Sequence, residues 1–155
     1  MQRIGILPHL GKPKARELAH RVKEMLEVAG VEIWVPQEVS DELQWENTST
    51  LHVGHEPLGV DAAVVLGGDG TLLHAAGFLA PFGIALLGVN LGYLGFLTEI
   101  EAKELEPAVG RLVARDYEIE DRMLLEAVVH GENRTERFLA VNDIVITRSA
   151  FARMI

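Results

Sequence analysis

Apolar and polar positions follow two alternating periods along the chain as far as Asp121. Short continuous apolar runs predict buried strands at 3–7, 31–35, 61–66 and 84–89. Apolar side chains recur every three or four residues over 14–29, which predicts an amphipathic helix that ends before Gly30. Further helices are predicted at 71–79, at 103–115, and at 41–45 within the long polar connection 36–59.

Two of these segments carry a more specific expectation. The run 84–89 has no polar side chain, which is typical of a strand buried on both faces of a parallel sheet. Thr98 and Glu101 stand three residues apart ahead of the helix 103–115, the spacing of a capping box.

The alternation of strand and helix predicts an α/β fold with a Rossmann-like parallel sheet over residues 1–121. Beyond it, 124–130 and 138–147 are both strand-like and are separated by a turn at 131–133. No helix intervenes, so antiparallel pairing is expected. We therefore predict an α/β nucleotide-binding domain at 1–121. Residues 122–155 are predicted to be the beginning of a β-rich domain that is incomplete, because the sequence stops in another apolar stretch.

Composition and charge exclude several classes of function. There is no cysteine, which rules out disulfides and thiolate metal sites. The net charge of −9 argues against a broad nucleic-acid-binding face, although a small polyanion can still bind through local N–H groups, a few cations and Mg²⁺. The apolar runs are too short to span a membrane and the N-terminus resembles a strand rather than a signal peptide, so we expect a cytoplasmic protein.

The segment Gly67-Gly68-Asp69-Gly70-Thr71 joins a predicted strand to a predicted helix. Its three glycines let a ligand approach the backbone, and the helix that follows offers N–H groups and partial positive charge to a phosphate. A carboxylate in such a loop repels phosphates unless a metal ion bridges the two or the acid takes up a proton. A P-loop is excluded because no Lys follows Gly70, and a dinucleotide fingerprint because Leu73 stands at the third glycine position.

Two further segments are candidates for the same site. Gly88, Gly92 and Gly95 surround Phe96 just beyond another predicted strand, where ligands bind in open α/β sheets; an ordinary loop remains the alternative. Asn142-Asp143 interrupts the apolar segment 138–147. An amide and a carboxylate can bind ribose hydroxyls, but a turn or β-bulge explains this segment equally well.

The order of three motifs resembles that of the NAD kinases, which phosphorylate the 2′-hydroxyl of the adenosine ribose of NAD. The motifs are Gly-Gly-Asp-Gly-Thr at 67–71, Leu-Gly-Tyr-Leu-Gly-Phe-Leu-Thr at 91–98 and Val-Asn-Asp-Ile-Val at 141–145. The resemblance covers nearly the whole chain. The first motif alone is shared with diacylglycerol and sphingosine kinases and with relatives of phosphofructokinase, so the later two carry the assignment.

The resemblance implies roles for individual residues. Asp69 matches the general base, and the phosphate loop comprises Gly67, Gly68, Gly70 and Thr71. Contacts with NAD are implied for Asp69, Gly70, His74, Phe96, Asn142, Asp143 and Arg153. Without the resemblance, His74 is read as a half-buried helix histidine and Arg153 as a solvated charge.

The resemblance also implies the substrates and the assembly. The donor is expected to be ATP or polyphosphate, with Mg²⁺ and no direct protein ligand to it, in a homo-oligomer (dimer or tetramer) without nucleic acid or membrane partners. Members of the family continue well past this point, so the 155-residue chain is expected to be truncated and inactive by itself. Two alternatives are a lipid kinase of the diacylglycerol or sphingosine type and a non-catalytic NAD-binding fragment.

Overall fold

The structure, a computed structural model, describes residues 2–52, 59–92, 95, 97–98, 100–132 and 134–146. The chain divides into two compact units, Met1–Ile119 and Glu120–Ile155, and each is described by itself. Two of the predicted site residues, Phe96 and Arg153, lie outside the described residues.

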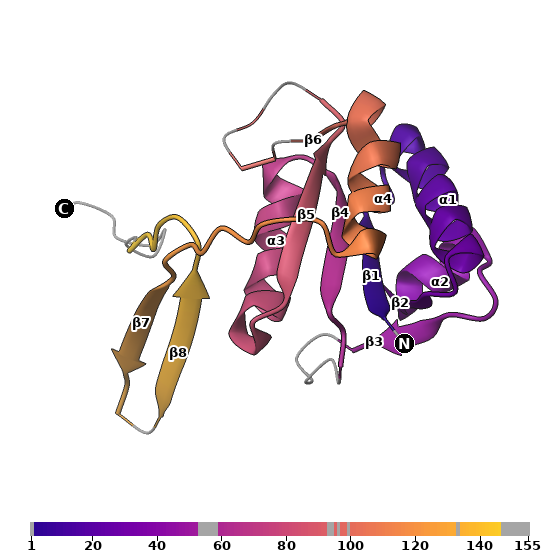
Figure 1. Ribbon diagram of the computed structural model, residues 1–155. Helices are drawn as coiled ribbons and strands as arrows, with labels where there is room; N and C mark the ends of the chain where they lie inside the picture. The colour runs from indigo at the N-terminus through magenta and orange to yellow at the C-terminus, as the bar shows by residue number, and fades with distance from the viewer. Residues whose placement is uncertain are drawn as a thin grey trace. The chain divides into compact units, whose positions relative to one another are not determined.

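The first unit alternates strands and helices, as the periodicity predicts (Figure 1). Its elements in chain order are β1 (Arg3–Pro8), α1 (Pro13–Val28), β2 (Glu32–Pro36), α2 (Gln37–Leu43), β3 (Ser49–Leu51), β4 (Ala62–Gly67), α3 (Asp69–Leu79), η1 (Ala80–Phe82), β5 (Ala85–Asn90), β6 (Ile100–Glu101), η2 (Ala102–Glu104) and α4 (Leu105–Ala114).

The six strands form one parallel sheet in the order β3-β2-β1-β4-β5-β6. This is the doubly wound order of Rossmann-type sheets, so the predicted α/β class is confirmed. The chain proceeds outward from β1 to β3 and then returns to place β4 on the other side of β1. The order reverses between β1 and β4, and ligands of such sheets bind beyond the carboxyl ends of the strands at this point.

The core lies on both faces of this sheet. Residues of α1, α2 and α4 pack with Ile4 and Val64 on one face, and residues of α3 pack with Leu7 and Val65 on the other (Figure 1). Because helices cover both faces, β4 is buried at every position, and its sequence is a continuous apolar run rather than an alternating one.

Three local expectations need correction. The connection 36–59 contains a helix at Gln37–Leu43 rather than 41–45, and also strand β3, which is too short to give a periodic signal. Residues 85–88 of β5 are partly exposed rather than fully buried, because β6 pairs only with the last two residues of β5. The capping box ahead of α4 is formed by Glu101 and Glu104 around η2, not by Thr98.

The second unit contains a β-hairpin of β7 (Leu125–His130) and β8 (Thr135–Ala140), antiparallel as predicted. The second strand was predicted at 138–147, whereas β8 begins at Thr135 and ends at Ala140. One face carries Leu125, Ala127 and Val129 opposite Ala140, Phe138 and Glu136. Phe138 and Val129 are each 50% exposed, so the hairpin by itself leaves this apolar face accessible to solvent.

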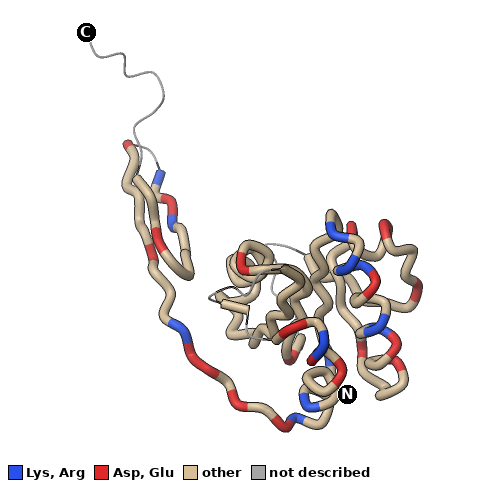
Figure 2. Tube along the Cα trace, turned by 90° about the horizontal axis from the view of Figure 1, so that it is seen from above, with Lys and Arg blue, Asp and Glu red and all other residues tan. Residues whose placement is uncertain are grey.

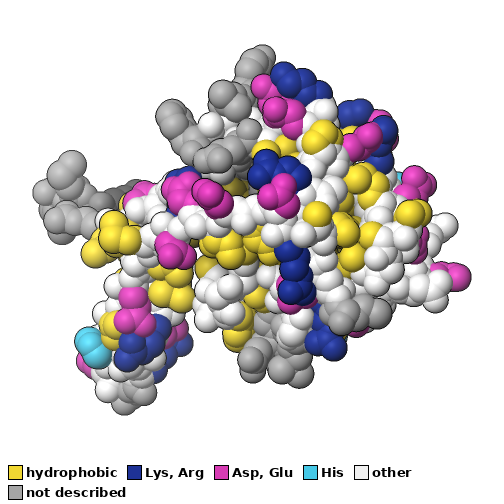
Figure 3. Space-filling model, viewed as in Figure 1, with side chains coloured by type: hydrophobic (Ala, Val, Ile, Leu, Met, Phe, Trp, Pro, Cys, Tyr) yellow, Lys and Arg dark blue, Asp and Glu magenta, His cyan; other side chains and the backbone are white. Residues whose placement is uncertain are grey.

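Charged residues of both signs are interspersed along the trace (Figure 2). In the space-filling view, many Lys and Arg side chains lie beside Asp or Glu (Figure 3). Some ion pairs lie within one helix, such as Lys14–Glu17 in α1, and others join elements, such as Arg21–Glu106 between α1 and α4. No helix in the described part is both long enough and apolar enough to cross a membrane.

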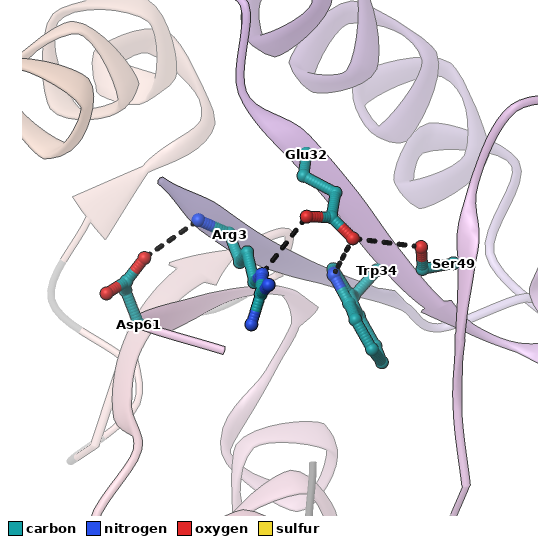
Figure 4. A network of polar contacts seen from close by, with 5 residues as sticks. All are labelled: Arg3, Glu32, Trp34, Ser49 and Asp61. Carbon is teal, nitrogen blue, oxygen red and sulfur yellow. Dashed lines mark hydrogen bonds and ion pairs between the residues drawn. The ribbon is translucent and has the colours of Figure 1, made fainter. Parts of the chain in front are cut away.

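A polar network links the amino ends of four strands (Figure 4). The Glu32 carboxylate accepts hydrogen bonds from Arg3 Nε at 3.0 Å, Trp34 Nε1 at 3.0 Å and Ser49 Oγ at 3.1 Å, and Arg3 N donates to Asp61 Oδ2 at 2.8 Å. Desolvation raises the pKa of Glu32, but the hydrogen bonds and the Arg3 charge outweigh it and hold this pKa below its ordinary value. The network lies at the opposite end of the strands from the glycine loop.

Candidate functional site

The glycine loop connects the carboxyl end of β4 to the first turn of α3. Gly67 is the last residue of β4, Gly68 caps α3, and Asp69 is the first helical residue. A Cβ on Gly67 would lie 2.2 Å from Thr71 Oγ1, so a side chain there would displace Thr71. The N–H groups of Thr71 and Leu72 donate to Gly68 O at 2.9 and 3.0 Å, which closes the first turn.

Backbone hydrogen bonds join this loop to the strand ends on either side. His9 N, just beyond β1, donates to Leu66 O at 2.9 Å, and Leu91 N, just beyond β5, donates to Gly67 O at 2.7 Å. Gly67 is in register with Asn90 at the end of β5. The two glycine clusters therefore lie at the ends of adjacent strands.

The Asp69 carboxylate is held by the segment between β5 and β6. Its Oδ1 accepts hydrogen bonds from Leu97 N at 3.2 Å, Thr98 N at 3.2 Å and Thr98 Oγ1 at 3.1 Å. A Cβ on Gly95 would lie 2.1 Å from the same oxygen, so the close approach of this loop requires glycine. The carboxylate is thereby fixed in orientation.

Thr98 and Gly95 are site residues whose roles the sequence interpretation missed. Thr98 is 2% exposed, and its hydroxyl donates to Asp69 instead of capping a helix. A Cβ on Gly88 would approach Thr98 Cγ2 and Leu72 Cδ2 to 3.2 Å, so Gly88 lets α3 and the loop pack closely. Asn90, 6% exposed, accepts a hydrogen bond from Gly92 N at 3.0 Å and shapes the turn after β5.

A cleft of about 550 Å³ lies at the carboxyl ends of β1 and β4, where the strand order reverses. Its walls are the loop between β1 and α1, the start of α2 and the first turns of α3. Gly68, Gly70, Thr71 and His74 line it from α3. His74 is exposed, and its ring packs edge-on against Phe78 at 5.9 Å between centroids. The volume and position suit part of a nucleotide.

The family model described as the ATP-NAD kinase N-terminal domain matches residues 4–117. The chain belongs to the NAD kinase family. It is 42% identical over 155 residues to the NAD kinase of Moorella thermoacetica, covering 100% of this chain and 49% of that protein. It is 41% identical to the NAD kinase of Caldanaerobacter subterraneus subsp. tengcongensis, covering 99% of this chain and 54% of that protein. The chain thus spans about half the length of the curated relatives it matches.

A solved structure of yeast NADH kinase complexed with NADH has the same fold as this NAD kinase family member. The TM-score is 0.74 at 23% identity, covering 92% of this chain and 47% of that one. The resemblance stated from the three motifs is confirmed at the level of the family. The lipid kinase alternative is not favoured, because relatives named NAD kinase match essentially the entire chain.

Four of the predicted contacts with NAD fall outside the described residues of the first unit. Asn142 and Asp143 lie in the second unit, just beyond β8, and both are exposed. Their role in binding NAD stays a prediction. The same holds for Phe96 and Arg153, which are not among the described residues.

The described residues contain no group of three or more His, Asp or Glu side chains that could hold a metal ion.

Proposed function

We propose that the full-length protein containing this chain transfers a phosphoryl group from ATP or polyphosphate to the 2′-hydroxyl of the adenosine ribose of NAD and forms NADP. Membership of the NAD kinase family supports this reaction. At the site, the proposal depends on the Asp69 carboxylate. Asp69 is the first residue of α3, and three hydrogen-bond donors orient its side chain.

In the proposed reaction Asp69 acts as general base. It accepts the proton of the 2′-hydroxyl while that oxygen attacks the terminal phosphorus of the donor. The bond from phosphorus to the bridging oxygen breaks, and the leaving phosphate takes the electron pair. Catalysis of this kind rests mainly on positioning and charge stabilisation, and Mg²⁺ bound to the phosphates would neutralise part of their charge.

The chain supplies the positioning. The amino end of α3 and the glycine backbone at Gly68 and Gly70 can receive a phosphate without steric hindrance, since a Cβ added at either meets no atom within 4 Å. Thr71 lines the cleft beside them.

Contacts with the dinucleotide are proposed from the family resemblance. Asn142 and Asp143 would hold the adenosine ribose, with Gly70, His74, Phe96 and Arg153 as further contacts. Homo-oligomeric assembly and a cytoplasmic location are proposed on the same basis.

The decisive experiment offers NAD and diacylglycerol side by side to the full-length protein with labelled ATP and Mg²⁺. The labelled phosphate is expected in NADP alone. Labelled phosphate found only in the lipid would overturn the proposal. Asp69→Asn is expected to lower turnover by roughly 10²–10⁴-fold, the scale of a lost general base. Asp41→Asn is the matched control, because Asp41 is an exposed α2 carboxylate that accepts a hydrogen bond from Gln37.

A further inference from the structure

Almost every Lys and Arg side chain in the described ranges has an acidic partner. The pairs include Arg3–Glu32, Arg16–Glu42 and Lys103–Glu101. Within those ranges, Lys12 and Arg115 are the exceptions among Lys and Arg, and only Lys12 lines the cleft.

The position of Lys12 makes its lack of a partner informative. The residue is partly buried, in a chain of net charge −9 that offers many carboxylates. Removing an ammonium group from water without an anion is unfavourable, so a partly buried, unpaired lysine in a cleft is suited to an anionic ligand. Glu38 is the carboxylate among the lining residues, and its charge opposes such a ligand.

The loop that carries Lys12 is fixed relative to the glycine loop. Lys12 N donates to His9 O at 2.9 Å, and His9 N donates to Leu66 O, one residue before Gly67. On the other side of the turn, Ala15 N donates to Lys12 O at 3.0 Å at the start of α1. Lys12 therefore stands at a defined place on the wall that the β1–α1 loop contributes to the cleft.

The two sides of the glycine loop differ in their chemistry. Asp69 turns its carboxylate toward Leu97 and Thr98, beyond β5, whereas Gly68, Gly70 and Thr71 line the cleft beyond β1. In phosphoryl transfer the attacking and leaving oxygens lie roughly in line on opposite sides of the phosphorus. An acceptor hydroxyl that reaches Asp69 therefore requires the leaving phosphates to lie on the cleft side.

We infer that the cleft between the β1–α1 loop and α3 binds the polyphosphate chain of the phosphoryl donor, and that Lys12 positions it. The inference rests on the proposed phosphoryl transfer and names the donor side of that site. A lysine suits this task as a mobile point charge that contacts phosphate oxygens. The pyrophosphate group of the dinucleotide has the same chemistry and is the alternative occupant of the cleft.

The test compares Lys12→Met with Lys14→Met in the full-length protein. Both variants remove one positive charge, but Lys14 is exposed on α1 and pairs with Glu17 at 2.8 Å. Initial rates are measured with ATP varied at saturating NAD, and with NAD varied at saturating ATP. Lys12→Met is expected to raise KM for ATP by roughly tenfold or more, the scale of one lost hydrogen bond to a charged group, with KM for NAD within twofold of the parent. Lys14→Met is expected to match the parent.

Two more variants sharpen the result. Lys12→Arg keeps the charge and should recover part of the affinity for ATP, and Glu38→Gln removes the opposing charge and should lower KM for ATP. An unchanged KM for ATP in Lys12→Met, or a rise in KM for NAD alone, overturns the donor assignment. If Lys12→Met does not fold, as judged by its melting temperature, Lys12→Gln replaces it.

Failure of the proposed reaction gives a different result. A parent protein that does not phosphorylate NAD refutes the proposed function, and calorimetric titration of ATP with Mg²⁺ into the parent and Lys12→Met then tests the cleft directly. Equal affinity of the two proteins for ATP would overturn the inference there as well.

Discussion

Replacing Thr98 by valine removes one hydroxyl and nearly preserves the volume of the side chain. The hydroxyl donates to Asp69 Oδ1 at 3.1 Å, while the methyl group Cγ2 faces Gly88. The complementary change, Thr98→Ser, keeps the hydroxyl and removes the methyl group. The two variants therefore separate the polar role of Thr98 from its packing role.

The structure sets the expected magnitudes. A hydrogen bond to a charged group contributes about 1.5–3 kcal/mol, but Asp69 Oδ1 keeps two backbone donors at 3.2 Å in Thr98→Val. We expect the lower end of that range to appear in the rate, a loss of roughly tenfold in kcat at about 1.4 kcal/mol per factor of ten. Thr98→Ser should keep kcat near the parent's but lose about 0.5–1.5 kcal/mol of unfolding free energy, the scale of one deleted buried methyl group.

The assay measures kcat and both KM values in the full-length protein, together with urea unfolding of each variant. Thr98→Val is expected to be slow but stable, and Thr98→Ser to be active but less stable. If both variants lose kcat equally, or if Thr98→Val turns over like the parent, the Thr98 hydroxyl does not position Asp69.

Three further outcomes are expected. Gly95→Ala should lower kcat by roughly tenfold or more, because its Cβ would meet Asp69 Oδ1 at 2.1 Å and a displacement of about 1 Å can cost ~10²-fold in rate; an alanine variant with parental kcat would refute the close approach. Because the folded pKa of Glu32 lies below its unfolded value, its network stabilises the protein above the unfolded pKa and less as pH falls through the folded pKa. Urea unfolding should therefore show Glu32→Gln less stable than the parent at pH 7 and closer to it at pH 3, and an equal difference at both pH values contradicts this. The 155-residue chain by itself should show negligible turnover and self-associate through the exposed hairpin face, whereas a monomer with full activity in light scattering and rate assays would disprove that expectation.

The local sequence pattern was sufficient to predict most strands and helices of the α/β unit, because the periods of strands and helices are properties of the backbone itself. The runs at 61–66 and 14–29 predict β4 and α1 to within about two residues. The glycine loop was placed correctly between a strand and a helix, and together with the motifs at 91–98 and 141–145 it predicted the family. Strand β3 was missed because three residues are too few to show a period, and it forms through its pairing with β2.

The tertiary structure decided which residues form hydrogen bonds with Asp69, the proposed general base. Thr98 lies 29 residues from Asp69 in the chain, and its local spacing to Glu101 predicted a helix cap instead. Lys12 belongs to no motif, and it lines the same cleft as the glycine loop because β1 and β4 are neighbours in the sheet. The order of strands depends on which apolar faces pack together across the whole unit, and no short segment encodes it. The sequence by itself therefore determined most of the elements and the family, while the folded sheet decided which side chains surround Asp69 and the cleft.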